Sequence, residues 1–332
     1  MAPAPPAAES VMAVRKILCV LLAAVLAVSA FSGCTVQQNP DVDDGKLHVV
    51  TTIFAPYDFA RQVGGDDVSV TMLLRPGCEV HSYEPTPKDI IAIRNADVFV
   101  YVGGESDAWV KTVLDGVDNP NLRVVTLMDC VELLDEETVE GMQTEKHGHD
   151  HADAHDTEPD EHVWTSPRNA ARICQKLADT FAGADSAHAA DYAQRCGDYV
   201  EKLNQLDAEF QDVVERAARK TVVFADRFPL RYFADAYGLD YYAAYPGCAD
   251  AAEPSAAMVA FLIDKVRAEG IPVVFTIELS NGKLADTICE ATGAKKLKFA
   301  TCHNVTAQAF ADGATYLQLM EHNVQALREA LN

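Results

Sequence analysis

The chain has 332 residues, a formal net charge of −23 and nine cysteines, none of them in a Cys-X-X-Cys pair. A chain this acidic is not expected to bind nucleic acid through its phosphates, because like charges repel. Without Cys-X-X-Cys pairs, an all-cysteine zinc site of the finger type is not expected either. The length is sufficient for two domains, each with a core of its own.

The N-terminus has the features of a secretory signal. Two basic residues precede a short apolar run over 17–30, and the sequence Phe-Ser-Gly-Cys34 follows. This ending resembles a bacterial lipobox, although Phe31 stands where an aliphatic residue is usual. Residues 1–33 are therefore predicted to be a lipoprotein signal peptide and 34–45 a flexible tether. A lipid on Cys34 would anchor the extracytoplasmic protein to the outer face of the cell membrane; the alternative is an uncleaved membrane anchor.

Residues 46–166 are predicted to form an N-terminal α/β lobe. Apolar runs rich in β-branched residues are typical of buried strands. Four such runs cover 47–54, 68–74, 96–102 and 122–127, with helical patterns at 57–63, 86–95 and 108–115 between them. Alternating strands and helices predict a parallel sheet with crossover helices.

The stretch 167–220 has no strand pattern and is predicted to be a helical linker. Its apolar residues recur at helical spacing, and Gly183 divides it into two helices. The second helix is expected to run over roughly thirty residues or more, so that it lies across both lobes.

Strands and helices alternate again over 221–332, which is predicted to form a C-terminal α/β lobe. Strands are expected at 221–225, 239–244, 271–277 and 296–300, and helices at 254–268, 282–292 and 314–331. The predicted fold class is therefore α/β, with two similar lobes linked by a long rigid helix. A ligand site is expected in the cleft between the lobes, at the carboxyl ends of the strands.

The segment 135–161 is rich in acidic residues and contains four closely spaced histidines, His147, His149, His151 and His155. It has too few apolar residues to bury a core, so it is predicted to be a disordered loop. Closely spaced histidines are typical of weak metal binding, whereas acidic runs are often only a solvated surface. We interpret the segment as a metal-gathering loop and not as the primary site.

Two histidine motifs lie in loops at the expected cleft. His81 follows the second predicted strand in the sequence His-Ser-Tyr-Glu-Pro-Thr-Pro, and His162 stands in Asp-Glu-His-Val-Trp-Thr-Ser-Pro. Either histidine by itself is more often structural than a ligand. Two of them in comparable places can reach one ion, and neutral imidazole binds zinc, manganese or nickel well.

These motifs resemble those of the zinc/manganese solute-binding lipoproteins of bacterial ABC importers, as does the C-terminal run Gly-Ala-Thr-Tyr-Leu-Gln-Leu-Met over 313–320. The resemblance covers 46–332. It implies one metal ion held between two lobes, with His81 and His162 as the ligands of the first lobe. It further implies a monomeric protein that delivers the ion to the membrane permease of an ABC importer.

The second lobe departs from the family pattern. Members usually have His or Glu ten positions before the tyrosine of a Tyr-Gly-Leu sequence, where this chain has Arg227. A guanidinium has no lone pair for a metal. Asp226 or a water is expected to replace it, although Asp226 could equally pair with Arg227 or cap a helix. In the loop where the family usually has an Asp ligand, His303 is the candidate.

Three imidazoles with one carboxylate or water suit four-coordinate Zn²⁺. Mn²⁺ is a harder ion that prefers oxygen ligands, so a site with two carboxylates would have favoured it. Zn²⁺ is therefore the predicted ion, and Mn²⁺ or Ni²⁺ the alternative.

Two cysteines occupy loops of the second lobe, Cys248 and Cys302, and the latter adjoins His303. A disulfide between them would fix the His303 loop. The alternative is that Cys302 or Cys78 binds zinc as a thiolate.

The chain is not predicted to be an enzyme. A zinc hydrolase needs an open metal position and a carboxylate base, for which Glu278 and Glu84 are candidates. The sequence has no His-Glu-X-X-His and no Gly-X-Ser-X-Gly. An adhesin-type surface lipoprotein is the third interpretation.

Overall fold

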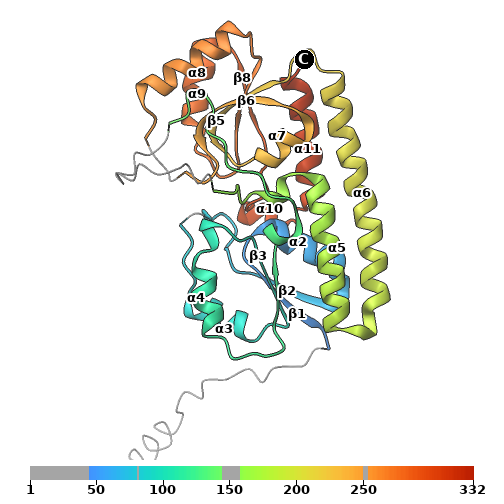
Figure 1. Cartoon of the computed structure of the whole chain (residues 1–332). Coiled ribbons are helices and arrows are strands. Elements are labelled where there is room, and N and C mark those ends of the chain that lie inside the picture. The colour runs from blue at the N-terminus through green and yellow to red at the C-terminus, as the bar shows by residue number, and fades with distance from the viewer. Residues whose placement is uncertain (1–44, 81, 144–157, 250–252) are drawn as a thin grey trace, which may run out of the picture. The chain divides into compact units, whose positions relative to one another are not determined.

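Two four-stranded parallel sheets with the same strand order form the framework of the computed structural model (Figure 1). The structure describes residues 45–80, 82–143, 158–249 and 253–332. These residues belong to one compact unit that starts at Gly45. The predicted signal peptide, the tether and Cys34 lie outside the described residues.

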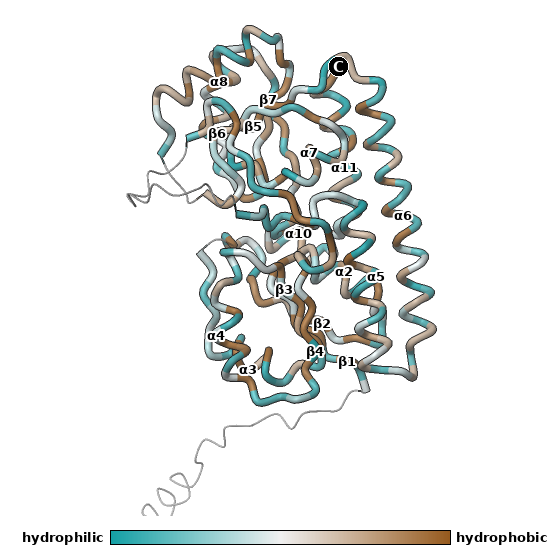
Figure 2. The backbone as a smooth tube through the Cα atoms, viewed as in Figure 1, coloured by the Kyte–Doolittle hydropathy of each residue, from teal (hydrophilic) through white to brown (hydrophobic). Residues whose placement is uncertain are grey.

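The first sheet has the order β2-β1-β3-β4. Its strands are β1 (Leu47–Thr51), β2 (Val68–Met72), β3 (Val98–Tyr101) and β4 (Arg123–Thr126), and its crossover helices are α2 (Phe54–Gly64), α3 (Pro87–Arg94) and α4 (Trp109–Asp115). Valine-rich strands suit a sheet that is covered on both faces. Figure 2 shows these strands as hydrophobic over most of their length. Helix α3 begins where the sequence dictates, since Thr86 and Asp89 form a capping box around Pro87.

The second sheet repeats this pattern in the order β6-β5-β7-β8. Its strands are β5 (Thr221–Phe228), β6 (Asp240–Pro246), β7 (Val273–Thr276) and β8 (Lys295–Lys298), and its crossover helices are α7 (Arg231–Tyr237), α8 (Ala256–Ala268) and α9 (Lys283–Thr292). Each lobe therefore has the same β-α-β-α-β-α-β succession, which confirms the predicted class of two similar α/β lobes.

Two antiparallel helices connect the lobes, α5 (Pro167–Ala184) and α6 (Ala189–Glu215). Helix α6 runs alongside both lobes in Figure 1. Its Tyr199 ring lies 6.4 Å from that of Phe59 in α2, and its Phe210 ring lies 4.9 Å from that of Phe233 in α7. With 27 residues it is shorter than expected, because residues 186–188 form a separate 3₁₀ turn before it.

Two further helices close the chain, α10 (Ala307–Ala311) and α11 (Tyr316–Ala330). Helix α11 belongs to the second half of the sequence, yet its first residue bonds to the first lobe. The backbone N–H of Tyr316 donates to the buried Asp58 carboxylate in α2 at 2.8 Å. A carboxylate at this helix N-terminus satisfies a backbone donor and interacts favourably with the positive end of the helix dipole.

The described ends of the acidic segment are ordered, which differs from the disorder expected over 135–161. Asp135 and Pro159 form an antiparallel bridge, and the amide of Asp160 donates to the Leu134 carbonyl at 2.8 Å. Apolar neighbours such as Leu134 give these ends something to pack against. The four loop histidines, between positions 147 and 155, lie outside the described residues. Among the residues that the structure covers, no helix is both long and apolar enough to cross a bilayer.

Candidate metal centre

His162 and His303, the former at the end of the first lobe and the latter in the loop after β8, lie face to edge with ring centroids 4.8 Å apart. Both are buried, with exposed fractions of 0% and 8%. The Trp164 ring stands edge-on to His303 at 4.9 Å, and its indole N–H donates to the Thr301 carbonyl at 2.8 Å. Residues more than 130 positions apart thus form one aromatic cluster between the lobes.

Asp160 fixes the orientation of His162. Its Oδ1 accepts the backbone N–H of His162 at 2.8 Å and lies 3.0 Å from Nδ1 of the ring. Burial alone would lower the pKa of His162, but the Asp160 carboxylate, together with those of Glu161 and Glu136, outweighs that effect and the pKa is raised. With Nδ1 directed at Asp160, Nε2 is the nitrogen that would bind a metal, as in the carboxylate–histidine pairs of metal sites.

His303 is oriented by two hydrogen bonds in series. The Thr301 hydroxyl donates to Glu278 at 2.6 Å, so its oxygen can accept from Nδ1 of His303, which lies 2.6 Å away. Glu278 also accepts the backbone N–H groups of Thr301 at 2.7 Å and His303 at 3.0 Å. Burial raises the pKa of Glu278, and these hydrogen bonds oppose the rise.

Replacing Glu278 with glutamine is expected to weaken metal binding by roughly 10–100-fold, the usual loss when an outer partner of a ligand is changed. The amide retains the volume of the carboxylate but turns one acceptor oxygen into a donor, which opposes the donors of Thr301 and His303. Titration of the variant with zinc, beside the wild type, measures the change. Unaltered affinity would show that Glu278 does not position His303.

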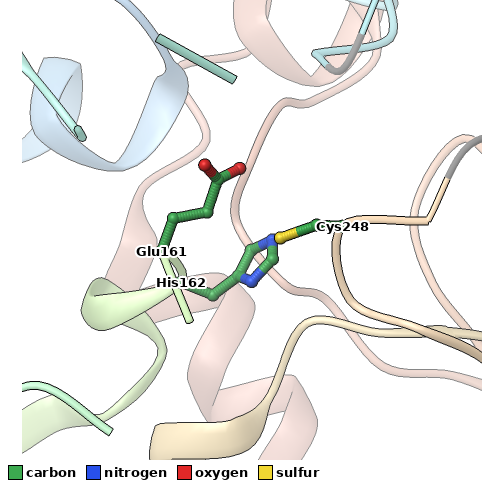
Figure 3. Close-up of side chains that lie close together, drawn as sticks. All are labelled: Glu161, His162 and Cys248. Atoms are coloured by element: carbon green, nitrogen blue, oxygen red, sulfur yellow. The ribbon is translucent and has the colours of Figure 1, made fainter. Parts of the chain in front are cut away.

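His162 also belongs to a group of three side chains that could hold a metal ion. One ligand atom each of Glu161, His162 and Cys248 lies within 4.8 Å of the others. Figure 3 shows the Cys248 sulfur beside the His162 ring and the Glu161 carboxylate directed away from it. Glu161 accepts hydrogen bonds from the backbone N–H of Ser106 at 3.1 Å and from its hydroxyl. Burial, reinforced by the Glu161 and Glu136 carboxylates, raises the pKa of the Cys248 thiol.

The predicted ligand Asp226 is not brought to this cluster. Strand β5 extends to Phe228, with a register shift against β6 between Phe224 and Arg227. Asp226 and Arg227 both line a cavity that also includes Glu253, whereas Asp226 does not line the cavity next to His303. Arg227 lines the cavity next to His303 and forms an ion pair with Glu79 at 2.9 Å.

The predicted disulfide between Cys248 and Cys302 is not formed, and both are free thiols. Cys302 is fully buried and has a φ of 63°, and its pKa is raised by burial and by the nearby Glu278 and Asp58. Cys248 instead lies beside Glu161 and His162. The two thiols therefore have different surroundings. The remaining predicted ligand, His81, lies outside the described residues.

Several features of the centre were not predicted from the sequence: Asp160, Thr301, Glu161 and the position of Cys248 beside His162. A local pattern could have found two of them. Asp160 and Thr301 each stand two positions before a histidine, and each contacts Nδ1 of that histidine. Glu278 was considered only as a hydrolytic base, whereas its described contacts support the His303 loop.

A family model described as zinc-uptake complex component A, periplasmic, matches residues 49–330. The zinc-binding lipoprotein AdcA of Streptococcus pneumoniae is 31% identical over 310 residues, which cover 93% of this chain and 60% of AdcA. The chain thus spans less than two thirds of that relative. The high-affinity zinc uptake system protein ZnuA of Bacillus subtilis is 29% identical over 316 residues, covering 95% of this chain and 97% of ZnuA.

A solved structure has the same fold. The Zn(II)-bound ZnuA-like domain of Streptococcus pneumoniae AdcA aligns with a TM-score of 0.71 and 29% identity, over 86% of this chain and 99% of that domain. The similarity therefore extends over nearly all the residues described.

Proposed function

We propose, because this chain belongs to the zinc-uptake complex component A family, that it captures Zn²⁺ outside the cytoplasm and delivers it to the membrane permease of an ABC importer. The observation that carries the proposal is the pair His162 and His303, which come from different lobes and lie 4.8 Å apart. Each has Nδ1 directed at an oxygen, which leaves Nε2 as the nitrogen for a metal. Buried, pre-oriented imidazoles suit zinc.

His81, His162 and His303 form the proposed ligand set. The assignment of His81 rests on its sequence motif, which comes after β2 in the chain. The motif that contains His162 comes directly before α5. Asp226 is left out of the set, because it lines the cavity that includes Glu253 and not the one next to His303.

Capture fits the surroundings of Glu278 better than hydrolysis does. A hydrolytic base must face a metal-bound water. The carboxylate of Glu278 instead accepts three hydrogen bonds from Thr301 and His303. Its contacts therefore favour a structural task.

Isothermal titration of protein from residue 35 onward with zinc and with manganese tests the function. One tight zinc site per chain is expected, with weaker manganese binding. Loss of the tight site in a His81→Ala, His162→Ala double variant supports the ligand set. Retention of the site in that variant would refute it, and zinc-dependent hydrolysis of ester or phosphate substrates would favour an enzyme.

The four loop histidines are expected to add weaker sites, because ordering a polar loop around each ion has an entropic cost. Replacing His147, His149, His151 and His155 with asparagine should remove the weak stoichiometry and leave the tight constant nearly unchanged. The same titration measures both. A weakened tight constant would place the loop within the primary site.

Attachment to the membrane is proposed to depend on a lipid at Cys34. A Cys34→Ala variant should be released from the membrane fraction, whereas the wild type should remain in it. Association of the wild type with membranes after removal of the lipid would contradict this.

A further inference from the structure

The second lobe lacks one metal ligand among its described residues if zinc is to be four-coordinate. His303 is its only histidine at the centre. Arg227 stands at the β5 position where a ligand was expected, and it pairs there with Glu79 at 2.9 Å. Asp226 lines the cavity that includes Glu253 and not the one next to His303. Among the described residues the centre has two imidazoles, those of His162 and His303, and a four-coordinate zinc needs further ligands.

Cys248 lies where it could supply one of these ligands. It follows β6, the strand beside β5, and so emerges at the same carboxyl edge of the sheet. Its sulfur is within 4.8 Å of a ligand atom of His162. The preceding Gly247 makes this approach possible, since a Cβ there would stand 3.0 Å from Cε1 of His162.

Two contacts hold the Cys248 loop against the first lobe. The backbone N–H of Cys248 donates to Oε1 of Glu136 at 3.1 Å. The backbone N–H of Glu161 donates to the thiol itself. Both contacts come from the segment that leads to His162, so they fix the sulfur relative to that histidine.

We propose that Cys248 binds the captured zinc as a thiolate, beside His162, and is the second ligand from the C-terminal lobe. This inference rests on the proposed zinc-capture function. Ligand atoms of a tetrahedral zinc site with one sulfur are about 3.5 Å apart. The Cys248 sulfur and a ligand atom of His162 lie within 4.8 Å of each other, so zinc binding would draw these two side chains closer together. Zinc deprotonates a coordinated thiol, and the proton leaves to solvent.

Glu161 is the rival within the same cluster. Its carboxylate oxygen meets the same 4.8 Å limit as the Cys248 sulfur, but the carboxylate already accepts two hydrogen bonds from Ser106.

The thiolate gives the site a preference between ions. Sulfur ligands select zinc, whereas manganese prefers carboxylate, carbonyl and water oxygens. A centre that combines imidazoles with a thiolate therefore discriminates against manganese by ligand type.

Cobalt(II) titration followed by absorption tests the proposal, because thiolate ligation produces an intense near-ultraviolet charge-transfer band that imidazole and carboxylate ligands lack. The wild type should show this band, and Cys248→Ser should lose it while still binding cobalt. Zinc affinity of Cys248→Ser should fall by roughly 100-fold or more, beyond what changing an outer partner causes. The ratio of the variant's zinc affinity to its manganese affinity should be smaller than in the wild type.

Three controls separate the outcomes. Cys289→Ser, in α9 and away from the centre, should keep the band, and so should Glu161→Gln. Cys78→Ser tests the cysteine that lines the cavity next to His303. Tight cobalt binding without the band in the wild type, or loss of the band only in Cys78→Ser, would overturn the proposal and leave zinc capture standing. Absence of any tight metal binding would instead refute the function itself.

Discussion

Replacing His162 with alanine is expected to weaken zinc binding by more than about 100-fold, because even the loss of an outer partner costs roughly 10–100-fold. His162 has an exposed fraction of 0%, and its ring lies against His303, Trp164 and Gly247. Competition against a chelating zinc indicator measures the constant.

A matched control comes from the exposed His322 in α11. His322→Ala removes one imidazole far from the centre in sequence and should leave the tight constant unchanged. Circular dichroism of both variants checks that the fold persists. Equal losses in the two variants would mean that His162 has no special role.

The second large effect is expected at Trp164, where alanine should lower the free energy of unfolding by about 3–5 kcal/mol. The side chain is 1% exposed, and its N–H bond to the Thr301 carbonyl joins the first lobe to the His303 loop. Its removal leaves a large cavity and an unpaired buried carbonyl. Urea unfolding without metal measures the loss, and zinc titration should show weaker binding because both histidine rings lose a neighbour.

The other tryptophan provides the comparison. Trp109 begins α4, is partly exposed and packs on Tyr83 at 5.7 Å. Trp109→Ala should destabilise the protein less and leave zinc binding intact. If the two substitutions had the same effect on zinc binding, the link from Trp164 to the centre would be wrong.

Sequence patterns predicted the long elements well because those depend on local chemistry. All eight strands occur near their expected places, since runs of β-branched residues have few other ways to bury their side chains. Helices α7 and α10 were missed, with seven and five residues respectively. So short a helix shows too few turns for its periodicity to be recognised.

The sequence left the orientation of Asp226 open for a related reason. Ending β5 at Ala225 left Asp226 in a loop, where it could face either way. The strand continues to Phe228 with a register shift between Phe224 and Arg227, and of Asp226 and Arg227 only the latter lines the cavity next to His303. Cys248 was beyond prediction as a neighbour of His162, because only the packing of two lobes brings residues 86 positions apart together.

The 27-residue helix α6 has a mechanical consequence. At 1.5 Å per residue the helix is about 40 Å long, and aromatic contacts join it to both lobes. A large rotation of one lobe against the other would bend this helix and break hydrogen bonds along it. The two lobes are therefore expected to move little relative to each other. An ion held between the lobes would then enter and leave through small displacements of the loops that surround it.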